Sequence, residues 1–66
     1  MIIIEIQQGA EGLPAVLYEV CDSKAIAESK YHTTLSYAAV STVKIHSVLM
    51  VDADGTVLKR ETYYHE

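Results

Sequence analysis

The sequence has little of what usually stabilises a small fold, because its one cysteine, Cys21, cannot form an internal disulfide. A folded chain of 66 residues hides only about 60% of the surface that it exposes when unfolded, so the core is thin. A lone thiol fits a reducing compartment, where a buried cysteine acts as a small hydrophobic residue. We therefore expect one cytoplasmic domain over residues 1–66 that gains stability from a partner chain.

Basic residues and long apolar runs are also scarce. Five Lys and Arg stand against nine Asp and Glu, for a net charge of −4, and the basic residues are scattered. Nucleic-acid binding needs clustered basic side chains, so we expect none. The run "MIIIEI" is short, lacks a basic flank and contains Glu5, so it predicts neither a signal peptide nor a membrane span. Hydrophobic residues nevertheless make up 50%, which predicts a folded domain.

Glycine and proline gather mainly in one stretch, "QGAEGLP" from Gln8 to Pro14, which predicts a turn. Before it, residues 2–7 are rich in β-branched side chains and predict a strand buried on both faces. After it, residues 15–21 alternate and predict a second strand, with Val16, Tyr18 and Val20 on one face.

A helix is predicted next, capped by Asp22 or Ser23 and free of Gly and Pro as far as Ser41. One stripe at spacings of three and four predicts the face that packs on a sheet, and it comprises Ala27, Tyr31, Thr34, Leu35, Ala38 and Thr42. A second line through Ile26, Thr33 and Tyr37 is either the edge of the core or a partner contact.

From Lys44 the hydrophobic period changes to two on both sides of "DADG", which predicts two strands of a hairpin. The stretch "MVDADGTVLKRE" also matches much of an EF-hand loop, but such a loop needs flanking helices and has Met50 in its first ligand position. We therefore expect Asp52 and Asp54 to accept local hydrogen bonds and Gly55 to supply a positive φ.

Residues with catalytic or metal-binding chemistry do not form a motif. His32, His46 and His65 lack the spacing of a zinc site, and the chain shows no nucleophile elbow or phosphate-binding loop. We predict no catalytic residue, no metal and no cofactor, and so no enzyme. Aromatic and Arg side chains favour protein interfaces, and the end "KRETYYHE" is rich in them. The alternative is a last strand with one Tyr in the core and one outside. The predicted interface or ligand surface comprises Tyr18, His46, Val48, Met50, Arg60, Tyr63, Tyr64 and His65.

The helix and the hairpin "HSVLMVDADGTVLKRETYYH" resemble small uncharacterised proteins encoded by phages and conjugative elements of gut bacteria. This resemblance implies a role in regulation or in countering host defence, and it implies no catalytic residue.

Together the patterns predict an α+β fold of order β-β-α-β-β, with a four-stranded, largely antiparallel sheet and one helix on one face. One helix leaves the second sheet face bare, so we expect a homodimer, formed face to face in preference to edge to edge. The leading functional hypothesis is a non-enzymatic protein-interaction module. The alternative is a small-ligand or nucleotide-binding protein with its site at the subunit interface.

Overall fold

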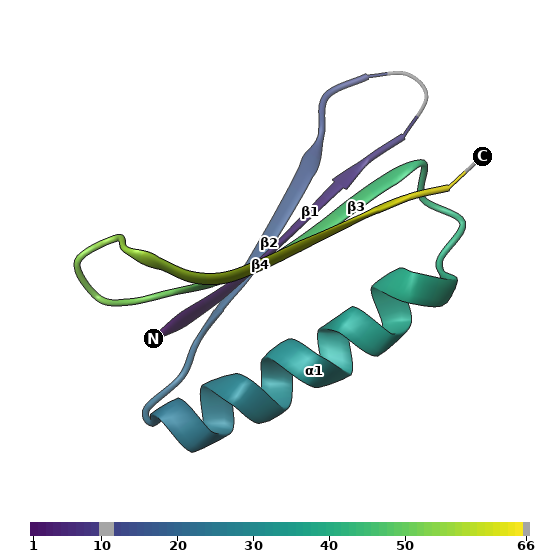
Figure 1. Cartoon of the computed structure of the whole chain (residues 1–66). Helices are drawn as coiled ribbons and strands as arrows, with labels where there is room; N and C mark the ends of the chain where they lie inside the picture. The colour runs from purple at the N-terminus through teal and green to yellow at the C-terminus, as the bar shows by residue number, and fades with distance from the viewer. Residues whose placement is uncertain (10–11, 66) are drawn as a thin grey trace.

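A computed structural model describes residues 1–9 and 12–65 and confirms the predicted order of elements. The strands are β1 (Ile2–Gln8), β2 (Ala15–Val20), β3 (Ile45–Val51) and β4 (Val57–Tyr64), and the helix is α1 (Lys24–Val40). The strands form one antiparallel sheet in the order β2-β1-β3-β4, and α1 crosses one side of it (Figure 1). The predicted turn from Gln8 to Pro14 includes Ala10 and Glu11, which lie outside the described residues.

The predicted start of the helix is confirmed, but α1 ends at Val40, so Thr42 of the predicted stripe lies outside the helix and is exposed. Ser23 is the N-cap, and its Oγ accepts a hydrogen bond from the backbone N–H of Ile26 at 3.2 Å. At the other end Ser41 is extended, and its N–H donates to the carbonyl of Ala38 at 3.3 Å. A side-chain cap and a turn-type bond therefore define the two ends of α1.

The Asp52–Gly55 segment is a hairpin turn, as predicted. The side chain of Asp52 accepts from the N–H of Ala53 at 2.7 Å, and that of Asp54 accepts from the N–H of Thr56 at 3.0 Å. Gly55 has a φ of +92°. The hydrogen bonds from Thr56 lower the pKa of Asp54. Both flanks are strands, so the resemblance to an EF-hand ends at the loop residues.

The core lies between α1 and one face of the sheet. Ala27, Tyr31 and Ala38 are buried on the sheet side of α1, as the helical stripe predicts. They pack against Ile3 of β1 and against Val48 and Met50 of β3. Two of the helix residues at this contact are alanines, which let the helix approach the strands closely.

Register divides the strand residues into two faces, because antiparallel partners point to the same side. The covered face, which faces α1, comprises Ile3, Glu5, Gln7, Ala15, Leu17, Glu19, His46, Val48, Met50, Lys59, Glu61 and Tyr63. The open face comprises Ile2, Ile4, Ile6, Gln8, Val16, Tyr18, Val20, Ile45, Ser47, Leu49, Val51, Val57, Arg60, Thr62 and Tyr64. Val16, Tyr18 and Val20 share one face, as predicted.

This division corrects two expectations. Strand β1 is not fully buried on both faces, since only Ile3 among its residues is buried. Val48 and Met50 have exposed fractions of 0% and 1%, and His46 has 3%. These three residues belong to the core under α1 and cannot line a surface in the folded chain.

Candidate interaction surface

The open face is a sheet surface rich in apolar side chains that no other element of the described chain covers. Its outer members are well exposed: 74% of Tyr18 and 75% of Tyr64 are accessible to solvent. Its central members, Ile4, Ile6 and Leu49, are partly shielded by neighbouring side chains. Val51, at a register irregularity beside the hairpin, is buried. Exposed contiguous apolar patches of this kind mark interaction sites on soluble proteins.

The charges lie mainly on the opposite side of the sheet. Among the strand residues in the registers above, the covered face has four charged side chains, Glu5, Glu19, Lys59 and Glu61, and also the imidazole of His46. The open face has one charged residue in the same registers, Arg60. Glu19 and Glu61 are exposed on the edge strands, whereas Glu5 and His46 lie nearer the helix. In composition the bare face is therefore the more apolar of the two.

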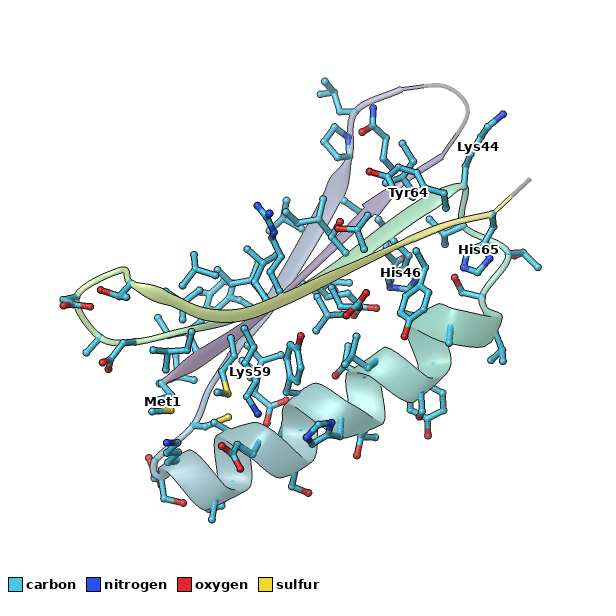
Figure 2. All side chains as sticks on the ribbon, viewed as in Figure 1. Met1, Lys44, His46, Lys59, Tyr64 and His65 are labelled. Atoms are coloured by element: carbon cyan, nitrogen blue, oxygen red, sulfur yellow. The ribbon has the colours of Figure 1, made fainter. Side chains whose placement is uncertain are left out.

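Three of the predicted surface residues lie on the open face. Tyr18 comes from the edge strand β2, and Arg60 and Tyr64 come from the opposite edge strand β4. Figure 2 shows Tyr64 on the side of the sheet away from α1 and His46 between the sheet and the helix. The aromatic rings of Tyr18 and Tyr64 thus flank a centre of Ile and Leu side chains.

The remaining two candidates, Tyr63 and His65, are partly buried, and His65 lies beside the end of α1. Tyr63 lies on the covered face and packs partly buried against the core. The Nε2 of His65 lies 2.8 Å from the carbonyl oxygen of Ala38, near the helix C-terminus. The two rings are stacked, with centroids 6.3 Å apart and planes 16° apart. The alternative in which one of Tyr63 and Tyr64 faces the core is confirmed.

A polar network holds His46 in the core. Its Nδ1 lies 2.8 Å from Oγ of Ser41, and its Nε2 contacts Oε2 of Glu5. Gln7 donates from Nε2 to the same carboxylate oxygen at 3.2 Å. If Nε2 carries the proton, His46 donates to Glu5 and accepts from the hydroxyl of Ser41, so both ring nitrogens are paired. This network is the reason a buried imidazole is tolerated under α1.

The order Ser41, His46, Glu5 has the connectivity of a catalytic triad, but its surroundings oppose that chemistry. Ser41 follows the last turn of α1, where the helix dipole is negative and opposes a developing oxyanion. A hollow of about 430 Å³ at this end of the sheet is lined by Gln7, Leu13, Thr42, Val43, Lys44 and His65 among others, but by neither Ser41 nor His46. We therefore assign the network a structural role.

Sequence reasoning missed how the interface residues divide between the faces. Period-two alternation identified Ile2 and Ile4 as opposite to Ile3, and Leu49 as opposite to Val48 and Met50, but did not show which set α1 covers. The signal that distinguishes the two sets is the presence of polar residues, Glu5 and His46, in the set that α1 covers. Glu5 and His46 occupy neighbouring strands at positions where they can pair, and the helix end supplies Ser41.

Within residues 1–9 and 12–65, no three His, Cys, Asp or Glu side chains come together as metal ligands. In the same part of the chain, no helix combines the length and hydropathy that crossing a bilayer requires. Comparisons of the sequence with protein-family models and with curated proteins, and of the fold with solved structures, find no match.

Proposed function

We propose that this protein is a non-enzymatic interaction module that works as a homo-oligomer and binds its own copy through the open face. The observation that carries this proposal is the apolar composition of the open face, which has one charged residue in the strand registers and no covering helix. A role in regulation or in countering host defence, which the resemblance to mobile-element proteins implies, suits a module of this kind.

Magnitudes support self-association through this face. A face of four strands, each about 4.8 Å wide and about six residues of 3.3 Å long, has a plane area of about 400 Å². Two such faces bury about 800 Å² together, worth at most about 20 kcal/mol at 25 cal/mol per Å². Association costs about 4–15 kcal/mol in lost freedom, so this upper bound exceeds the cost by a small margin.

Charge does not oppose this arrangement. The net charge of −4 comes from residues that lie mostly outside the open face, where Arg60 is the charged member. Two open faces related by a two-fold axis therefore bring few like charges together. Because each chain uses the same face, the pairing ends with two chains.

Sedimentation velocity and light scattering at micromolar concentration test this proposal on the wild type and on Ile4→Lys. Ile4 is at the centre of the open face, so the new ammonium should lower the mass of the assembly while the circular dichroism spectrum stays folded. The matched control is Ser29→Lys, which adds the same charge on the exposed side of α1 and should leave the mass unchanged. A monomeric wild type, or an Ile4→Lys variant of unchanged mass, would refute the proposal.

A ligand-binding function is the second candidate, and one hollow favours it. A shallow depression of about 620 Å³ lies beside Ile6, Leu49, Arg60 and Tyr64. Face-to-face pairing would close it and place a guanidinium and a phenol against a bound anion, such as a nucleotide phosphate. A thermal-shift screen with nucleotides tests this candidate, and Arg60→Gln should abolish any shift that it finds.

A further inference from the structure

The two edges of the sheet differ in how well they are protected against pairing with another strand. On β4 three consecutive charged residues, Lys59, Arg60 and Glu61, occupy the edge, and the register shifts near Val51 where the strand begins. Charges and bulges of this kind block edge pairing. Strand β4 is therefore a protected edge.

Strand β2 has neither kind of protection. It reads "AVLYEV", contains no Lys, Arg or Pro, and pairs with β1 in an unbroken register. Its one charged residue, Glu19, is neutralised by Lys30 of α1, whose Nζ lies 2.8 Å from the carboxylate. All six residues are exposed, and half of the Leu17 side chain on the covered face is accessible (50%). An exposed and mostly apolar edge without a bulge is a template for another strand.

The helix leaves room above this edge. α1 packs on β3, β1 and β4, and the Lys30 ion pair is its link to β2. Ile26 and Tyr37, which lie on the same side of α1 as Lys30, are 48% and 68% exposed. This is the line of residues for which the sequence left core edge and partner contact open. Its exposed fractions place it outside the core.

We propose that β2 pairs antiparallel with β2 of a second copy, about a two-fold axis normal to the sheet, to make one continuous eight-stranded sheet. This proposal deepens the proposed function and rests on it for the final assembly. A normal two-fold axis keeps both open faces on one side, so they become a single apolar surface twice as large. Two such sheets then pack face to face, with the helices outside, as a tetramer with 222 symmetry.

The area that face-to-face packing buries favours a second copy of the chain as the partner of the β2 edge. One chain paired face to face with another buries about 800 Å² in total, below the 1,200–2,000 Å² of stable complexes. Doubling each sheet raises the face-to-face area to about 1,600 Å², the standard size. A single foreign strand on β2 would extend the open face by only one strand's width, about 4.8 Å, and would leave most of this shortfall.

Residue-resolved hydrogen exchange of the β2 amides tests the proposal without any substitution. Antiparallel pairing with β1 engages every second N–H, and the others point outward. Pairing with a second β2 should protect the outward amides near the two-fold axis as well, slowing their exchange by about a hundredfold or more. Strictly alternating protection in the purified protein would overturn the proposal and leave β2 free for a foreign strand.

Mass measurements of two variants separate this interface from the open face. Leu17→Asp places a carboxylate on the covered side of β2 and should halve the mass from four chains to two. Leu13→Asp is the matched control, since Leu13 lies before β2 and is 95% exposed, and it should keep the wild-type mass. Circular dichroism verifies that each variant is folded. A folded Leu17→Asp variant with the wild-type mass would refute edge pairing.

The two proposals fail in different ways. A two-chain wild type that Ile4→Lys dissociates, with alternating protection of β2, would keep the face interface and remove edge pairing. A two-chain wild type that Ile4→Lys leaves intact, with continuous protection of β2, would keep edge pairing and remove the face interface.

Discussion

The covered and open faces of the sheet differ in polarity, because polar side chains lie under the helix and apolar side chains lie on the uncovered side. Under α1 lie His46, Glu5 and Gln7, held by mutual hydrogen bonds, beside a small apolar cluster around Val48. On the other side Ile2, Ile4, Ile6 and Leu49 stand without a covering element. The difference shows that apolar strand residues are not confined to the side of the sheet that the helix covers. Under the proposed self-association, the open face forms a second core together with another chain.

The largest expected difference in stability is between substitutions at two adjacent residues, Val48 on the covered face and Leu49 on the open face. Val48→Asp buries an unpaired carboxylate under α1, at a cost of about 4 kcal/mol or more. The total stability at 0.05–0.15 kcal/mol per residue is only about 3–10 kcal/mol, so we expect the variant to be unfolded by circular dichroism. Leu49→Asp changes the open face and should fold with a reduced mass. A folded Val48→Asp variant would contradict the division into faces.

The polar network of the covered face gives the next largest effect. His46→Leu leaves the hydroxyl of Ser41 without its side-chain partner and leaves the carboxylate of Glu5 with Gln7 alone, so urea unfolding should show a loss of about 1–3 kcal/mol. Replacing both His46 and Glu5 with apolar groups removes the poorly paired carboxylate, so Glu5→Leu combined with His46→Leu should recover part of this loss. If the losses of the two single variants simply add, the pair does not act as a unit.

A smaller expected effect is on how stability depends on pH, and it comes from Tyr31, the tyrosine buried on the sheet side of α1. Burial, followed by the charge of Glu61, raises the pKa of this phenol above its ordinary value of 10.0. The folded chain therefore holds the proton longer than the unfolded chain, so its stability is complete below pH 10 and falls as the pH rises through the folded pKa. Thermal melts at increasing alkaline pH should show a shallower decline for Tyr31→Phe than for the wild type.

Most of the fold was predictable because it depends on local patterns. Ser23 as a cap, the stripe through Ala27, Tyr31 and Ala38, and the hairpin at Gly55 each follow from residues close in sequence. The order β2-β1-β3-β4 was not predictable, because several orders allow the same hairpins.

The covered face was not predictable from periodicity either. Alternation shows that Val48 and Leu49 point to opposite sides, but both sides are apolar enough to receive a helix whose contact residues include Ala27 and Ala38. The choice depends on the contact of His46 with Glu5, which are 41 positions apart in the sequence. Predicting Val48 and Met50 as surface residues was therefore wrong, whereas Tyr18, Arg60 and Tyr64 do share one exposed face.

Solvent exposure of the isoleucine methyl groups in solution tests the interface on the open face most directly. NMR with a soluble paramagnetic probe at micromolar protein concentration compares Ile3 on the covered face with Ile4 on the open face. If the open face is a completed core, the methyl groups of both residues are shielded from the probe, and dilution to the monomer exposes Ile4 alone. Strong relaxation of Ile4 beside a shielded Ile3, unchanged by concentration, would contradict an interface on the open face.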